Sequence, residues 1–178
     1  MQKKVVITGG PGTGKSSVIS SLQELKYTCM SEVSRKVTRD AQDRGVDQLF
    51  LKDPLKFSEL LLQGRINQYT DSDTHGGSAV FFDRGIPDVL GYLDYVKVSY
   101  PDFFKEACLQ YKYHKIFMMP PWKEIYKTDN ERYESFEQSL LIYENLKKTY
   151  SGIGYDFQVI PEGTIQDRVD YILTALAL

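Results

Sequence analysis

The feature that most constrains this chain is the segment 9–16, GGPGTGKS, which matches the pattern G-x-x-x-x-G-K-[ST] in full. It follows a β-branched run, residues 4–8, and precedes apolar residues at helical spacing, so strand, loop and helix occur in the required order. Glycines allow consecutive backbone amides to turn inward and form a concave anion site at the positive end of the helix. A chance match is on the order of a percent or less. The segment therefore predicts a site for the phosphates of a nucleotide.

The side chains of this loop have separate predicted roles. Lys15 supplies a mobile ammonium for the β- and γ-phosphates. The hydroxyl of Ser16 is a small, hard oxygen that suits Mg²⁺, which bridges those phosphates. The predicted cofactors are thus ATP or GTP together with Mg²⁺. The residues expected to bind the nucleotide are Gly10, Pro11, Gly12, Thr13, Gly14, Lys15, Ser16 and Ser17.

Strand candidates alternate with helix candidates along the chain. The strand candidates are residues 4–8, 27–31, 78–82, 115–119 and 157–160. Helices are expected from the loop to Leu25 and over residues 32–44, 53–69, 86–96, 101–111, 131–150 and 164–176. The run 78–82 shows no polar alternation, as in a strand of a parallel sheet that is buried on both faces. The pattern predicts a three-layer α/β fold, a five-stranded parallel sheet with helices on both faces.

Composition narrows the class of protein. The chain has 178 residues, 42% hydrophobic and 26% charged, which predicts one ordinary globular domain over 1–178. A net charge of -2 with mixed signs leaves no broad basic field, so we expect no nucleic-acid partner. No signal peptide or membrane span is visible, and the predicted location is the cytoplasm. Cys29 and Cys108 are far apart, which favours free thiols over a disulfide framework or a zinc site.

Two large classes of phosphate-loop protein fit poorly. Motor ATPases usually carry a hydrophobic strand that ends in Asp-Glu, together with a helical second domain, whereas this strand ends Phe82-Asp83-Arg84. Switch GTPases usually read guanine with an Asn-Lys-x-Asp motif, and the sequence has none. The small-molecule kinase-like branch remains, in which a strand ending in Asp-Arg lies beside the loop.

Three further segments carry a family resemblance. The segments are VFFDRGIPD, CMSEVSR and PPWKEIYKTDNERYESFEQSLLIYENL. Taken with the phosphate loop, they resemble the P-loop family that contains the NadR-type ribosylnicotinamide kinase domain and many bacterial predicted ATPases. The resemblance covers almost the whole chain. It implies Mg-dependent transfer of a phosphoryl group from ATP to a small hydroxyl-bearing, nucleoside-like acceptor. It also implies a lid that carries Arg132 and contacts to the nucleotide base after the last strand, at residues 161–163.

Asp83 and Arg84 end the strand 78–82, at the edge where open parallel sheets bind ligands. The carboxylate of Asp83 could hold Mg²⁺ through water or accept the proton of an acceptor hydroxyl. A helix cap or an ion pair with Arg84 is the alternative, and we favour the functional interpretation. Arg84 could direct its planar, permanently charged group at a substrate or phosphate, or pair with Asp83.

Glu32 and Arg35 follow the second strand candidate. The resembling kinases place a carboxylate there that deprotonates the acceptor hydroxyl, and Arg35, three residues later, could grip the acceptor. A surface Glu-Arg pair is the open alternative for both residues. Arg132 could stabilise charge on the transferring phosphoryl group, or be a solvated residue near a helix start.

The sequence thus predicts a set of catalytic and ligand-binding residues. The catalytic candidates are Lys15, Glu32, Asp83 and Arg132, the substrate-binding candidates are Glu32, Arg35 and Arg84, and the metal ligands are Ser16 and Asp83. Trp122 could stack on a purine or nicotinamide ring, whereas rings at helical spacing such as Phe136 and Tyr143 are interpreted as packing. The alternative function is an ATP- or GTP-binding NTPase, or a nucleotide-responsive binding module without a small-molecule acceptor.

Overall fold

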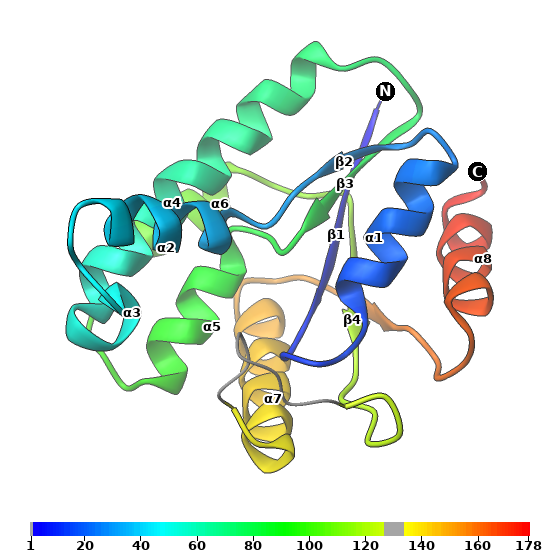
Figure 1. Cartoon of the computed structure of the whole chain (residues 1–178). Helices are drawn as coiled ribbons and strands as arrows, with labels where there is room; N and C mark the ends of the chain where they lie inside the picture. The colour runs from blue at the N-terminus through cyan, green and yellow to red at the C-terminus, as the bar shows by residue number, and fades with distance from the viewer. Residues whose placement is uncertain (1, 127–133) are drawn as a thin grey trace.

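The computed structural model describes residues 2–126 and 134–178 (Figure 1). Its strands are β1 (Lys3–Gly9), β2 (Thr28–Met30), β3 (Ala79–Asp83), β4 (Lys115–Met119) and β5 (Phe157–Val159). They form one parallel sheet of five strands in the order β2-β3-β1-β4-β5. The predicted fold class is confirmed. Because β1 is the central strand, the loop that follows it lies at the middle of the carboxyl edge of the sheet.

Helices connect the strands on both faces of the sheet. They are α1 (Lys15–Glu24), α2 (Val33–Asp43), α3 (Leu49–Lys52), α4 (Pro54–Asp71), α5 (Pro87–Tyr95), α6 (Phe103–Gln110), α7 (Phe136–Gly152) and α8 (Ile165–Leu176), with the short 3-10 helix η1 (Ser72–Thr74). The short α3 was not predicted from the sequence. It follows Gln48, whose left-handed backbone turns the chain back toward α4.

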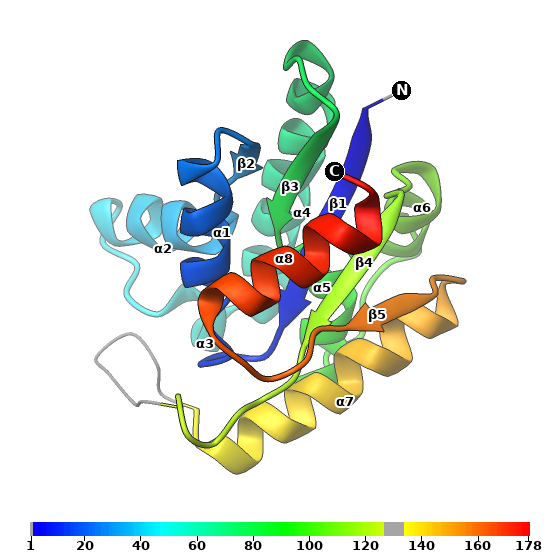
Figure 2. The ribbon, with the colours of Figure 1, turned by 90° about the vertical axis from the view of Figure 1, so that its right-hand side faces the viewer.

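The sheet separates two hydrophobic clusters. Successive residues of β1 point to opposite faces, so Val5 and Ile7 pack with α1 and α8, whereas Val6 packs in the cluster with α2, α4, α5, α6 and α7. The views in Figures 1 and 2 show α1 and α8 together on one face and the larger group of helices on the other. Strand β3 is buried along its whole length, as its apolar run predicts.

Helix α7 begins later than the sequence pattern predicts. A helix was expected from residue 131, but the described helix starts at Phe136 with Ser135 as its N-cap. The backbone N–H of Gln138 donates to Ser135 Oγ at 3.3 Å, and the N–H of Ser135 donates to Gln138 Oε1 at 2.7 Å. This reciprocal capping box fixes the point at which the helix begins. Arg132 and Tyr133 lie outside the described residues.

The sequence analysis also made predictions about membrane spans and cysteines. Among the described residues, no helix is long and apolar enough to cross a membrane. Cys29 and Cys108 are both free thiols, Cys108 buried and Cys29 partly exposed.

Candidate functional site

The phosphate loop connects β1 to α1, and the backbone conformation or the close packing at several of its positions requires glycine. Gly12 and Gly14 have φ of 71° and 84°, in the left-handed region that favours glycine. Gly9 has no room for a side chain, because a Cβ there would lie 2.3 Å from the carbonyl oxygen of Met119 on β4. A Cβ on Gly12 would lie 2.5 Å from the ring of Tyr126. The loop backbone is therefore packed closely against its neighbours.

Lys15 is buried on the first turn of α1. Its Nζ donates to the carbonyl oxygens of Gly9 at 2.9 Å and Gly10 at 2.6 Å, and to Thr13 Oγ1 at 3.2 Å. These acceptors are neutral. Burial, and then the nearby Arg84, lower the pKa of Lys15 to about 7. The ammonium is thus held at the loop in an environment that would favour an anionic partner.

The two predicted metal ligands, Ser16 and Asp83, lie on different elements, α1 and β3. Ser16 and Ser17 are exposed on the first turn of α1. Asp83 ends β3 beside Ile7 of β1, and is 7% exposed. Within the described part of the chain its Oδ1 accepts no hydrogen bond. Burial, followed by repulsion from Glu32, raises the pKa of Asp83. A buried carboxylate oxygen without a hydrogen-bond partner among the described residues suits a hard cation such as Mg²⁺.

Arg84 connects the loop to Glu32. Its Nε donates to Glu32 Oε1 at 2.7 Å, and one terminal nitrogen donates to the carbonyl oxygen of Gly9 at 3.0 Å and to Asp88 Oδ1 at 3.4 Å. The ion pair considered with Asp83 is replaced by pairs with Glu32 and Asp88. Burial alone would lower the pKa of Arg84, but the surrounding carboxylates outweigh it and raise the pKa.

Glu32 is the N-cap residue of α2 and a partner of Arg84. Burial raises its pKa, but the attraction of Arg84 and then of Lys15 is stronger and lowers it to about 2. Glu32 therefore stays ionised. Arg35 lies on the exposed side of α2, so Glu32 pairs with a residue 52 positions away rather than with its helical neighbour. Arg132, the remaining predicted residue, is outside the described part of the chain.

Two residues beside the loop carry contacts that the sequence interpretation did not predict. Arg168 of α8 donates to the carbonyl oxygen of Thr13 at 3.2 Å, and its guanidinium lies 5.9 Å from the centre of the Trp122 ring. A small cavity here is lined by Thr13, Met119, Pro120, Trp122, Ile160, Pro161, Glu162 and Arg168. No local pattern marks Arg168 as part of the site, because Thr13 and Trp122 come from distant segments of the chain. The segment 161–163, expected to touch a nucleotide base, contributes to this cavity.

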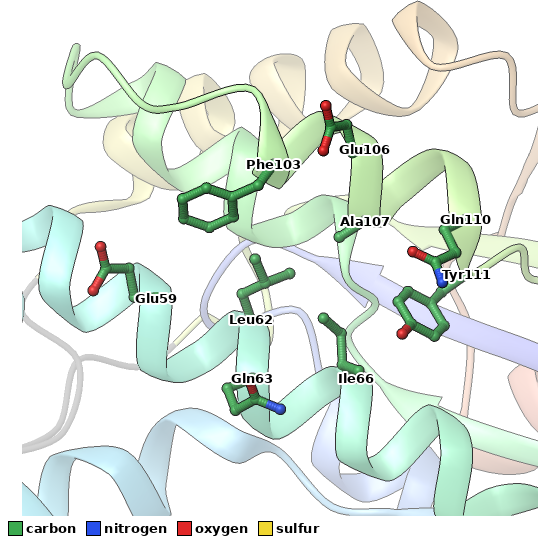
Figure 3. Close-up of a pocket in the computed structure, with 9 residues that line it drawn as sticks. All are labelled: Glu59, Leu62, Gln63, Ile66, Phe103, Glu106, Ala107, Gln110 and Tyr111. Atoms are coloured by element: carbon green, nitrogen blue, oxygen red, sulfur yellow. The ribbon is translucent and has the colours of Figure 1, made fainter.

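A larger hollow of about 420 Å³ lies elsewhere, between α4 and α6 (Figure 3). Its lining residues are Glu59, Leu62, Gln63, Ile66, Phe103, Glu106, Ala107, Gln110 and Tyr111. None of them belongs to the phosphate loop or to the group around Arg84. Size alone therefore does not locate the candidate site.

The strand order and the loop between β1 and α1 define a P-loop NTPase fold. A family model described as an AAA domain, AAA_28, matches residues 4–168, and the chain belongs to this family. The description names the AAA class, but β3 ends in Asp83 and is followed by Arg84, not by the Asp-Glu typical of motor ATPases. Family membership alone therefore does not imply a motor.

Solved structures of two other proteins, a deoxyadenosine kinase and NadR, share the fold. Deoxyadenosine kinase from M. mycoides with bound dATP superposes with a TM-score of 0.71 at 17% identity, covering 99% of this chain and 100% of the other. NadR in complex with NAD and AMP-PNP gives 0.74 at 16%, covering 99% and 50%. NadR in complex with NR gives 0.76 at 16%, covering 99% and 51%.

The chain thus spans about half the length of NadR. At these identities the likeness shows the fold alone. A search of curated proteins found no significant match.

Proposed function

We propose that this protein binds Mg-ATP or Mg-GTP and transfers the γ-phosphoryl group to a small, hydroxyl-bearing, nucleoside-like acceptor. One observation carries the proposal. The carbonyl oxygen of Gly9 accepts from both Lys15 Nζ and Arg84, and the same Arg84 pairs with Glu32. The predicted phosphate-binding and acceptor-binding groups therefore adjoin each other, as phosphoryl transfer requires.

Nucleotide binding is supported by the loop and by its surroundings. The loop combines the full motif with a buried lysine at the start of α1. Trp122 and Arg168 lie beside Thr13, and an aromatic ring and a guanidinium are both suitable surfaces for a purine to pack against. Two of the similar structures contain bound dATP and AMP-PNP, respectively. We place the nucleotide base of the donor near this pair.

A magnesium ion fits the same end of the loop. Ser16 and Asp83 would hold it, Asp83 through the oxygen that lacks a hydrogen-bond partner in the described residues. When bound, Mg²⁺ neutralises charge on the β- and γ-phosphates.

The acceptor would lie against Glu32, Arg84 and Arg35. Because Glu32 has a pKa of about 2, it would accept a hydrogen bond from the acceptor hydroxyl and align it, rather than take its proton. Asp83, whose pKa is raised in the metal-free protein, would be the proton acceptor only where its carboxylate does not hold Mg²⁺, since the ion would lower that pKa. The positioning role of Glu32 suits phosphoryl transfer, in which positioning and charge stabilisation matter most. A nucleoside-like acceptor is supported by the NR and nucleotide complexes of the similar folds. The proposed lid arginine, Arg132, is outside the described residues.

The test is a transfer assay with γ-labelled ATP and GTP and a panel of nucleosides and other small alcohols. We expect labelled product with at least one acceptor, and none from Lys15→Ala. Brisk hydrolysis that no acceptor changes would instead favour a plain NTPase. Nucleotide binding without turnover would favour a binding module.

We further propose that residues 1–178 act as one cytoplasmic domain. We also propose that the domain has no nucleic-acid partner, which the net charge of -2 supports.

A further inference from the structure

Asp88 is a buried carboxylate on the first turn of α5, only 4% exposed. Four hydrogen bonds converge on it. Its Oδ1 accepts from Thr8 Oγ1 at 2.5 Å and from Arg84 at 3.4 Å. Its Oδ2 accepts from the Tyr150 hydroxyl at 2.6 Å and from the backbone N–H of Gly85 at 2.9 Å. The charge is therefore surrounded by donors and by one guanidinium, as a buried carboxylate requires.

These donors come from three separate parts of the fold. Thr8 belongs to β1, just before the phosphate loop, Arg84 and Gly85 follow β3, and Tyr150 belongs to α7. Thr8 and Tyr150 are 80 and 62 positions from Asp88 in the sequence. Since all of these donors are buried or half-buried, loss of the carboxylate would leave several of them without a partner. Asp88 thus joins these segments at the carboxyl edge of the sheet.

The turn that carries Arg84 is held from both sides. Arg65 of α4 is 3% exposed and donates to the carbonyl oxygen of Gly85 at 2.8 Å. The Gly85 peptide unit is therefore bound by Asp88 at its N–H and by Arg65 at its carbonyl oxygen. Arg84 itself has a φ of 73°, a strained conformation for a residue with a side chain. Such strain persists only where the surroundings enforce it.

We infer that Asp88 is a positioning residue that holds the guanidinium of Arg84 against Glu32 and the carbonyl oxygen of Gly9. Arg84 reaches Glu32 through Nε, while its terminal nitrogen is divided between Gly9 and Asp88. Without the carboxylate, that end of the guanidinium keeps only a neutral carbonyl oxygen as its partner among the described residues. The effect on phosphoryl transfer rests on the proposed function, but the effect on Arg84 does not.

Asp88→Asn is the variant of choice because it keeps the size of the side chain. Whichever way the amide turns, its NH₂ group faces a hydrogen-bond donor, either the Arg84 guanidinium or the backbone N–H of Gly85, in place of an accepting carboxylate oxygen. Asp94→Asn is the matched control, since Asp94 is an exposed residue of the same helix and, within residues 2–126 and 134–178, its side chain accepts a hydrogen bond only from Tyr100. The first readout is hydrogen exchange at the arginine Nε–H groups, measured by NMR. The signal of Arg84 is identified as the one that disappears in Arg84→Lys.

We expect the Nε–H of Arg84 to exchange slowly in the wild type and about tenfold faster or more in Asp88→Asn, because a salt bridge held at one end opens more often. The Asp94→Asn control is expected to match the wild type. Unchanged exchange in a folded Asp88→Asn protein would overturn the inference. If Asp88→Asn does not fold, Asp88→Glu decides: it keeps the charge but moves the carboxylate away from its position beside Arg84, and exchange no faster than the wild type would overturn the inference as well.

Activity supplies the second readout. Asp88→Asn is expected to lower kcat with the identified acceptor about tenfold or more, while triphosphate affinity stays within about threefold. A purely structural role would lower the melting temperature without changing the kcat of the folded protein, and that result would contradict positioning. If the wild type transfers no phosphoryl group, the proposed function fails, whereas the exchange measurement still decides the role of Asp88.

Discussion

The phosphate loop and the ion cluster formed by Glu32, Arg84 and Asp88 meet at Gly9 but are built differently. Within the loop, Lys15 bonds to residues at most six positions away. In the cluster, Arg84 and Glu32 are 52 positions apart, and Thr8 and Asp88 are 80 positions apart. A local motif therefore forms the loop, whereas the cluster exists only once the sheet and its helices have assembled. We expect changes in the two regions to separate nucleotide binding from transfer.

The largest expected effect is that of Lys15→Ala on the loop. Removal of a buried ammonium that contacts phosphates should weaken triphosphate binding by about 100-fold or more, since truncating one partner of a buried charge pair costs about 2–5 kcal/mol. Isothermal titration calorimetry with ATP and GTP measures the change. Lys148→Ala, on an exposed position of α7, is the matched control and should bind normally. Wild-type affinity in Lys15→Ala would show that the loop does not bind the phosphates.

Glu32→Gln tests the cluster. The substitution keeps the shape but removes the charge that pairs with Arg84, so acceptor-dependent transfer should fall about 100-fold while triphosphate affinity changes little. Steady-state kinetics and calorimetry on the same preparation measure both quantities. Glu24→Gln, at the exposed end of α1, is the control. A loss of affinity that equals the loss of transfer would remove the distinction between the two regions.

A third prediction concerns pH. Because the pKa of Lys15 in the folded protein is about 7 and its ordinary value is 10.5, the unfolded chain binds more protons between these values. This lysine therefore makes the free energy of unfolding of the ligand-free protein rise as the pH rises above 7. A triphosphate needs the ammonium form, so its affinity should fall by up to about tenfold per pH unit above pH 7.

Calorimetry between about pH 7 and pH 9 measures this slope, with buffers of different ionisation enthalpy to count the proton taken up. The charged groups that act on Lys15 are Arg84, Asp83, Glu32 and Asp88. Lys15→Met should lose the slope. An affinity that is flat over this range in the wild type contradicts the lowered pKa.

The smallest effect is expected at the proposed base site. Trp122→Ala should weaken ATP binding about three- to tenfold, because a stacked ring contributes about 0.5–1.5 kcal/mol. Binding of inorganic tripolyphosphate should not change, since it has no base, and Trp122→Phe should keep most of the affinity. Equal losses for ATP and tripolyphosphate would mean that Trp122 supports the loop rather than the base.

Much of the fold could be predicted because its signals are local. The five strand candidates all match strands of the sheet within two residues at each end, and the buried β3 follows from an apolar run without alternation. The start of α7 was predicted too early because the aromatic spacing continued before it. The decisive signal was also local, since Ser135 and Gln138 have the spacing of a capping box.

The site could be predicted only in part. Lys15 and the loop glycines follow from the motif, and Asp83 follows from its place at a strand end. The partners of Arg84 do not, because Asp83 is its neighbour in sequence whereas Glu32 becomes its neighbour through the pairing of β2 with β3. Asp88 resembles an ordinary helix-start residue, and only burial reveals its role. The structure gives the positions of the described residues, whereas the roles assigned to all the site residues, Arg35 and Arg132 included, stay predictions.

The division of the core by the sheet has a consequence for how substitutions combine. Val5 and Val6 are adjacent in sequence but belong to different clusters. Changes in separate clusters should add, whereas changes within one cluster should show epistasis. Tyr150 and Val6 share the larger cluster, and Asp88 is bonded to Tyr150. Substitutions that compensate for changes around Asp88 are therefore expected among α4, α5 and α7 rather than in the layer of α1 and α8.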